Sequence, residues 1–210
     1  MKHVGEHIDG YYGTMIAGKG RAMPHERLGA FNDAVLAIVM TIIVLEFEVP
    51  DPLTVETLLG MWREVFAYAL SFFWLGAMWT NQHNFWHRIE RVSTPTILCD
   101  MVMLFFSSFF PLTTHMVADN FWNPLAQVTY GVVILLVTAA NVVLYARLRA
   151  DNGQAKGLPQ GILGSTRNMA LDIVAKLVGI ALSATVFPPA MMCSVLFTLC
   201  CIVIPQQLRG

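Results

Sequence analysis

Six long apolar segments, separated by short polar links, constrain this chain more than any other feature of its sequence. Their approximate bounds are Leu28–Val49, Leu58–Asn81, Thr96–Val117, Ala126–Leu148, Met169–Phe187 and Ala190–Leu208. A helix that crosses a hydrocarbon core of ~30 Å needs about 20 apolar residues. Of the 210 residues, 56% are hydrophobic and 13% are charged, whereas a soluble domain carries about 25% charged residues. We therefore expect an all-α, polytopic membrane protein with six transmembrane helices.

Prolines interrupt two parts of this pattern. Pro188 and Pro189 separate the fifth segment from the sixth, and they must break the helix because proline lacks an amide hydrogen and clashes with the preceding turn. Pro111 lies near the end of the third segment and predicts a kink or an early end there.

The distribution of basic residues predicts the orientation of the chain. The side that holds both termini has eleven of them: Lys2, Lys19, Arg21, Arg27, Arg88, Arg91, Arg147, Arg149, Lys156, Arg167 and Arg209. The opposite side has Arg63 alone, and Lys176 lies within the fifth segment. Because cytoplasmic loops are enriched in Lys and Arg, we expect both termini to be cytoplasmic. Residues 1–26 are glycine-rich and polar and are expected to be a mobile cytoplasmic tail, with residues 27–210 forming the membrane domain.

One face of the first segment carries a regular pattern. Ile38, Thr41, Ile42 and Leu45 recur at the spacing of a single helix face, and Phe31 extends that face toward the cytoplasm. Taken by itself, this periodicity is typical of ordinary helix packing, so the spacing alone does not identify a pore.

The same segment begins with three polar residues, Arg27, Asn32 and Asp33. A carboxylate that faces hydrocarbon costs roughly 2.5–3.5 kcal/mol on insertion scales. Arg27 and Asp33 are six residues apart, which excludes the usual i,i+4 pair. We expect their partners on other helices or loops.

Polar residues at the same membrane depth are candidate partners. Trp79 and His83 lie near the end of the second segment, and Asp100 lies in the third. One interpretation is a hydrogen-bonded tether that holds the first helix. The alternative is direct ion binding or a proton relay by Asp33, Asp100 or His83, because titratable groups inside membranes are functional candidates.

Two stretches of sequence resemble a known family. The run R-L-G-A-F-N-D, from Arg27 to Asp33, is similar to the R-x-x-x-F-S-D signature of the transmembrane protein 175 family, with Asn32 in place of the serine. The run W-T-N-Q-H-N-F-W-H-R-I, from Trp79 to Ile89, is similar to that family's W-x-N-H-H-x-x-F run. Asp100 stands where the family usually has asparagine.

The resemblance implies a potassium channel of the prokaryotic cell membrane. Prokaryotic members have one six-helix repeat in each chain and assemble as homotetramers around a pore lined by the first helix. The implied constriction is at Ile38, with further rings at Ile42 and Leu45 and a hydroxyl layer at Thr41. The residues implied to hold the pore helix are Arg27, Phe31, Asn32, Asp33, Trp79, His83 and Asp100.

Two physical arguments are compatible with a pore. A ring of apolar side chains can gate a channel by dewetting. Glu46, Glu48 and Asp51 lie at the outer end of the first segment, with no basic residue before Arg63, so they should attract cations to a pore mouth.

Other functions find less support in the sequence. A proton-permeable channel or a small proton- or cation-coupled transporter that uses Asp33, Asp100 and His83 remains the alternative. His83 and His87 have a spacing that suits a metal, but no third ligand is in register, and we expect no metal, no cofactor other than potassium as the permeant ion, and no nucleic acid. No catalytic motif is present, so an enzyme is not expected. Asp172 and Lys176 are predicted to form an i,i+4 ion pair.

Overall fold

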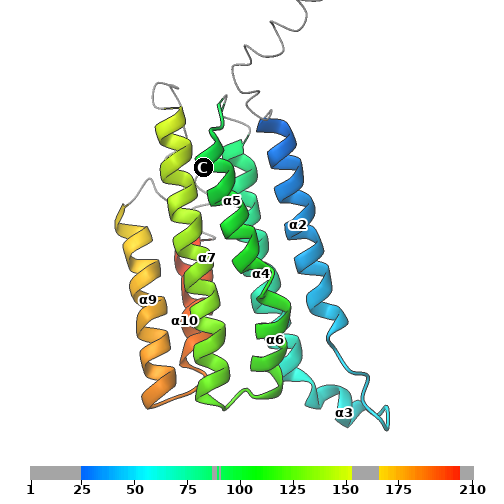
Figure 1. The fold of residues 1–210 in the computed structure, drawn as a ribbon. Helices are drawn as coiled ribbons and strands as arrows, with labels where there is room; N and C mark the ends of the chain where they lie inside the picture. The colour runs from blue at the N-terminus through cyan, green and yellow to red at the C-terminus, as the bar shows by residue number, and fades with distance from the viewer. Residues whose placement is uncertain (1–24, 87–88, 90, 153–165, 204–210) are drawn as a thin grey trace, which may run out of the picture.

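The chain forms a bundle of helices. The computed structural model describes residues 25–86, 89, 91–152 and 166–203, and this part of the chain is helical without a strand. Figure 1 shows the long helices running side by side, with α2 at one edge of the bundle and α9 at the other. The predicted all-α fold is confirmed, whereas the predicted tail at residues 1–26 lies almost entirely outside the described residues.

The helices follow one another in the order of the predicted segments. The long ones are α2 (His25–Leu45), α4 (Trp62–Trp86), α7 (Pro124–Asp151) and α9 (Thr166–Thr185). The third segment forms α5 (Thr94–Ser107) and α6 (Phe110–Asp119), and the sixth forms α10 (Ala190–Thr198) with a π-helical continuation, η1 (Leu199–Val203). A short helix, α3 (Val55–Gly60), joins α2 to α4.

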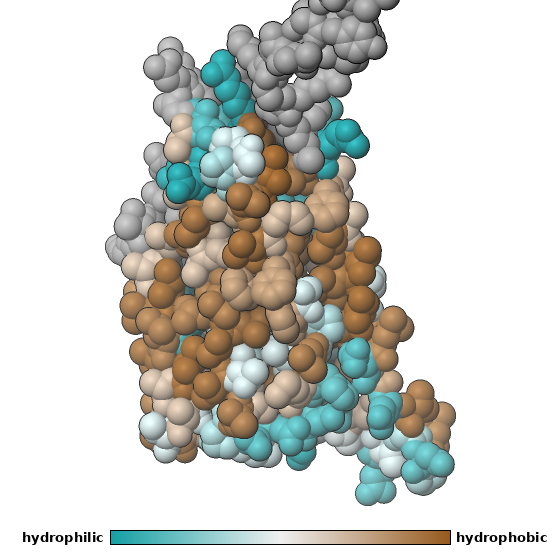
Figure 2. Space-filling view, in the orientation of Figure 1, coloured by the Kyte–Doolittle hydropathy of each residue, from teal (hydrophilic) through white to brown (hydrophobic). Residues whose placement is uncertain are grey.

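Four helical stretches in the described part are long and apolar enough to cross a membrane. They are Glu26–Leu45, Thr94–Asp119, Pro124–Asp151 and Asn168–Thr185. In Figure 2 hydrophobic residues dominate the middle of the visible face, and hydrophilic residues gather toward its ends. The protein is therefore a multi-pass membrane protein. Helix α4 has 25 residues but is not among these stretches, and α10 is short, so the number of six crossings stays a prediction.

The second segment differs from its predicted bounds of Leu58–Asn81. Residues 55–60 form a separate helix because Thr54 caps it, accepting a hydrogen bond from the Thr57 amide while the Thr57 hydroxyl accepts one from the Thr54 amide. At the other end α4 continues to Trp86, where its polar side chains find hydrogen-bond partners, some of them in α4 itself. Asn81, for example, donates to the carbonyl of Ala77.

The predicted proline breaks are present. Pro111 cannot donate to the carbonyl of Ser107, four residues earlier, and α5 ends at Ser107. Helix α9 ends at Thr185, and α10 begins after Pro188 and Pro189.

Small residues let α7, α9 and α10 approach closely. A Cβ atom added at Gly131 of α7 would lie 2.7 Å from side-chain atoms of Ile180 and Met191. A Cβ at Gly179 of α9 would lie 2.7 Å from the Cβ of Ser194. Such small-residue contacts are typical of helix packing in membranes, where backbones come close enough for extensive van der Waals contact.

Candidate functional site

Helix α2 has one face against the bundle and one face open. Its buried residues are Leu28, Asn32, Leu36, Val39 and Ile43, spaced by three or four positions, and they pack against α4, α5 and α6. The predicted pore face lies on the open side, with exposed fractions of 46% for Phe31, 56% for Ile38, 36% for Ile42 and 77% for Leu45. The described residues of a single chain therefore leave an apolar stripe of α2 partly exposed.

Thr41 lies on the same open face. Its hydroxyl donates a hydrogen bond of 2.9 Å to the carbonyl of Ile38, one turn earlier in α2. Because the hydroxyl proton is used within the helix, the lone pairs of Oγ1 remain available on the open face. The hydroxyl layer can thus accept hydrogen bonds or contact a cation.

Asn32 and Asp100 form the buried contact between α2 and α5. The Nδ2 amide of Asn32 donates to Oδ1 of Asp100 over 2.6 Å, and both residues are 0% exposed. A hydrogen bond to a carboxyl group at this burial ties the two helices near the end where α2 begins.

Asp33 contacts a different helix. Its Oδ1 accepts a hydrogen bond of 2.8 Å from Nε1 of Trp79 on α4. The Nδ1 atom of His83 lies 3.7 Å from Oδ2 of Asp33, which is beyond hydrogen-bond range. The His83 ring packs on the Trp79 ring, with centroids 5.1 Å apart. Two neighbouring residues of α2 are thus held by two different helices.

Arg27 does not join these contacts. It is exposed at the start of α2, and within the described residues of one chain its guanidinium has no hydrogen-bond or ion-pair partner. The first-helix motif therefore divides in the structure: Asn32 and Asp33 bind other helices, while Arg27 and Phe31 are exposed.

The structure adds polar partners that sequence reasoning missed. Gln82 of α4 is 1% exposed and donates to Oδ1 of Asn141 on α7 over 2.9 Å. Ser71 of α4 contacts the hydroxyls of Thr114 on α6 and Tyr130 on α7, at 2.8 and 2.9 Å. A signal existed for Asn141, because an amide inside an apolar segment requires a partner, but its position does not identify which one.

The C-terminal end of α2 borders a polar cavity of about 230 Å³ between α2, α4 and α6. Its acidic and basic lining residues are Glu46, Glu48, Glu64, His115 and Asp119. His115 lies 3.4 Å from Asp119, so the two interact within α6. Asp51 is exposed at the same end. Several carboxylates thus lie close to the C-terminal end of α2.

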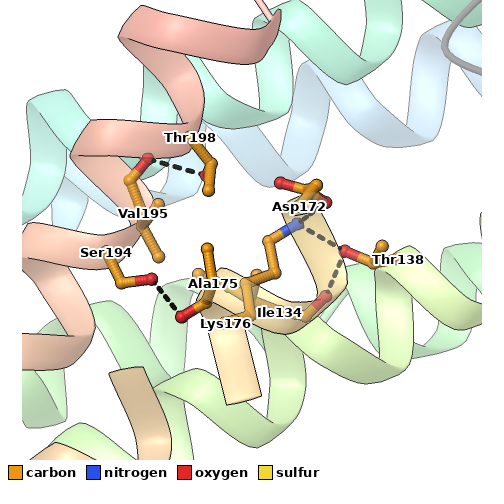
Figure 3. Close-up of polar contacts among 8 residues, drawn as sticks. All are labelled: Ile134, Thr138, Asp172, Ala175, Lys176, Ser194, Val195 and Thr198. Atoms are coloured by element: carbon orange, nitrogen blue, oxygen red, sulfur yellow. Dashed lines mark hydrogen bonds and ion pairs between the residues drawn. The ribbon is translucent and has the colours of Figure 1, made fainter. Parts of the chain in front are cut away.

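The predicted Asp172–Lys176 pair forms inside the bundle (Figure 3). Nζ of Lys176 is 2.5 Å from Oδ2 of Asp172 and donates to the hydroxyl of Thr138 on α7 over 2.9 Å. It also lies 5.1 Å from the centroid of the Trp74 ring on α4. Lys176 is 1% exposed, so this buried cation has three partners from three helices.

Comparison with known proteins finds similarity to one family of ion channels. The family model described as "Endosomal/lysosomal potassium channel TMEM175" matches residues 27–111. A potassium channel of Chryseobacterium sp. (strain P1-3) is 29% identical over 163 residues, which cover 77% of this chain and 83% of that protein. Over residues 27–111 the chain is similar to the TMEM175 family.

Further similarity to TMEM175 proteins comes from Chamaesiphon minutus. A potassium channel of strain ATCC 27169 / PCC 6605 is 31% identical over 123 residues, which cover 56% of this chain and 61% of the relative. The crystal structure of a lysosomal potassium-selective channel TMEM175 homolog from this organism superposes with a TM-score of 0.63 and 22% identity, covering 83% of this chain and 96% of that one. The structural match supports the fold.

The proteins that this chain resembles are named potassium channels and not enzymes, in agreement with the prediction. Among the described residues, no group of three or more His, Cys, Asp and Glu side chains is arranged to hold a metal ion. His87, the second histidine of the spacing considered above, lies outside the described residues.

Proposed function

We propose that this protein is a potassium channel of the cell membrane, formed by four copies of the chain around a pore lined by α2. The observation that carries the proposal is the open face of α2, where Ile38, Thr41, Ile42 and Leu45 are all exposed in the single chain. Relatives named as potassium channels support potassium as the permeant ion.

The narrow open face of α2 implies a symmetric assembly of several chains. One helix cannot enclose a pore, so several copies must surround an axis, and closed cyclic assemblies are the usual solution. In a four-fold assembly the Ile38 side chains meet as a hydrophobic ring, with Ile42 and Leu45 as further rings toward the outer end. Both termini are cytoplasmic in this arrangement.

The ring serves as constriction and gate. Water leaves a narrow apolar ring readily, so the ring blocks ions by dewetting until it widens. Four Thr41 hydroxyls, one turn further along, supply oxygen atoms that partly replace the hydration of a passing cation. Glu46, Glu48 and Asp51 concentrate cations at the outer mouth.

The contacts of Asn32 and Asp33 hold this helix against its own subunit. Asn32 is fixed to α5 and Asp33 to α4, and the two contacts orient the opposite face of α2 toward the axis. A pore helix that packs on its own subunit along one face only needs such contacts to fix its orientation. Arg27, which has no partner among the described residues of one chain, is placed to contact a neighbouring subunit or the lipid headgroups.

The deciding experiment combines bilayer recordings with one substitution. Under bi-ionic potassium and sodium, the purified protein should give currents whose reversal potential follows the potassium gradient. Ile38→Asn should wet the ring, raise the current and weaken the discrimination between potassium and sodium. The matched control is Val174→Asn on α9, which changes a side chain that is 54% exposed at the opposite edge of the bundle.

Three outcomes would overturn the proposal. An Ile38→Asn protein that assembles correctly and conducts like wild type would remove the constriction from Ile38. Native mass spectrometry that finds only monomers in mild detergent would exclude the pore itself. Slow, saturable, coupled flux without a channel current would indicate a transporter instead.

A further inference from the structure

The carboxyl group of Asp100 has one partner for two oxygen atoms. Asp100 is 0% exposed, and its Oδ1 accepts the hydrogen bond from Asn32. Its second oxygen, Oδ2, is buried without a hydrogen-bond partner. Buried polar atoms in native proteins are nearly always satisfied, so an orphaned carboxyl oxygen requires an explanation.

Asn32, the hydrogen-bond partner of Asp100, also has a buried oxygen atom without a partner. Oδ1 of Asn32 is also buried without a partner, although Nδ2 of the same amide donates to Asp100. Both orphaned atoms belong to side chains already joined by one hydrogen bond. Both are also acceptors if Asp100 is ionised, so neither can satisfy the other.

No described positive charge compensates an ionised Asp100. Lys176 is paired with Asp172, and Arg27 is exposed. On the helices around Asp100, the described titratable and charged groups toward this end are Glu26, Arg27 and Asp33 of α2, His83 of α4, Cys99 of α5, and Tyr145, Arg147, Arg149 and Asp151 of α7. Asp151 accepts hydrogen bonds from Ser93 and Thr96 at the start of α5. Asp33 and His83 lie beside each other, and the Tyr145 hydroxyl is buried without a hydrogen bond.

The cost of an unpaired charge then decides the protonation state. A buried ion without a counter-ion and with a single donor is much less stable than its neutral form. One hydrogen atom on Oδ2 converts that oxygen from an acceptor into a donor. The same hydrogen can be donated to the orphaned amide oxygen across the pair.

We propose that Asp100 is a proton-binding site, and that its Oδ2–H donates to Oδ1 of Asn32 to form a neutral, doubly hydrogen-bonded carboxylic acid–amide pair. The proton comes from water and returns to water when the site empties. The pair then joins α2 to α5 by two hydrogen bonds while the proton is bound and by one when it is lost. Loss of the proton at alkaline pH places two acceptor oxygens against each other and weakens the tether.

The proton itself can be observed by infrared spectroscopy of the folded protein. Difference spectra between neutral and strongly alkaline samples should contain the carbonyl stretch of a protonated carboxylic acid, and Asp100→Asn should remove it. Asp51→Asn is the matched control, because Asp51 is exposed and its removal should leave the band unchanged. If Asp100→Asn does not accumulate, aspartate labelled with ¹³C in the wild-type protein identifies the band by its isotope shift.

A second readout is the melting temperature as a function of pH. If the folded state holds a proton that the unfolded state releases, stability falls as pH rises. The wild-type melting temperature should therefore drop from neutral to alkaline pH more than that of Asp100→Asn, whose amide mimics the neutral acid.

A spectrum without an aspartic acid band at neutral pH overturns the proposal, as does an equal pH dependence of melting in wild type and Asp100→Asn. Neither measurement records an ionic current through the protein. The outcome therefore does not depend on the proposed channel function. Only the expected effect of alkaline pH on the pore helix rests on that function.

Discussion

Across the interface between α2 and α4, the indole nitrogen of Trp79 donates a hydrogen bond of 2.8 Å to Asp33, 46 positions away in the sequence. The next residue toward the N-terminus, Asn32, faces α5 instead and bonds Asp100. Adjacent helical residues point about 100° apart, so two neighbours can hold two different helices. The first turns of α2 are fixed in this way, while its Ile38 face stays open.

Trp79→Phe tests the contact with Asp33. Phenylalanine keeps an aromatic ring against His83 but removes the donor, so Asp33 loses its hydrogen bond. Because the Asp33 side chain is 37% exposed, water replaces part of this bond, and we expect a loss of about 1 kcal/mol. Thermal unfolding in detergent measures it. Trp62→Phe is the control, since the Trp62 ring is 50% exposed; equal melting temperatures in the two variants would contradict a stabilising Trp79–Asp33 bond.

Lys176→Met tests the buried ion pair. The substitution leaves Asp172 charged and 7% exposed without its cation, and removing one partner of a buried pair costs about 3–5 kcal/mol. We expect a large drop in melting temperature and in yield. The double variant Lys176→Met with Asp172→Leu removes both charges and should recover most of the loss. A double variant as unstable as the single one would show that packing, and not charge, dominates at this position.

Gly131→Ala tests the close contact of α7 with α9 and α10. The added Cβ would lie 2.7 Å from Ile180 and Met191, and overpacking of this kind costs about 1–3 kcal/mol. Gly60→Ala is the matched control, because nothing lies within 4 Å of a Cβ at that position. We expect Gly131→Ala to melt at a lower temperature than wild type and Gly60→Ala to melt at the same temperature or higher. If Gly131→Ala melted at a higher temperature than Gly60→Ala, the added methyl group would not disturb the contact of α7 with α9 and α10.

Thr41→Val tests the hydroxyl layer of the proposed pore. Valine keeps the branched shape and removes the oxygen, so we expect lower potassium-to-sodium selectivity in bi-ionic recordings with an unchanged melting temperature. Thr185→Val is the control, since Thr185 of α9 is also exposed and its hydroxyl also donates to a carbonyl of its own helix. Selectivity that is lost equally in both variants, or in neither, would argue against a specific role of Thr41.

Much of the fold could be predicted because a membrane helix is specified locally. A segment in lipid must satisfy its backbone hydrogen bonds internally, so apolar length and proline positions indicate where helices begin and end. The break at Pro111 and the turn at Pro188 followed from this rule. The separate helix α3 did not, because its start depends on the cap that Thr54 forms with Thr57, and a threonine pair in a loop is a weak signal.

For the candidate site, the sequence by itself determined the faces of α2. Helical periodicity places Ile38, Thr41, Ile42 and Leu45 together and turns Asn32 and Asp33 to other sides, whatever surrounds the helix. It also required polar partners for those two residues, because lipid offers none.

Only the tertiary structure decided which partners they have. Asn32 and Asp100 are 68 positions apart, and Gln82 and Asn141 are 59 apart. The sequence offered Trp79, His83 and Asp100 at one membrane depth without distinguishing among them. Their assignment depends on how α2 is rotated against α4 and α5, which is set by the packing of Leu28, Leu36 and Ile43 into the bundle. Helix formation is local, whereas the rotation of one helix against its neighbours is a property of the whole core.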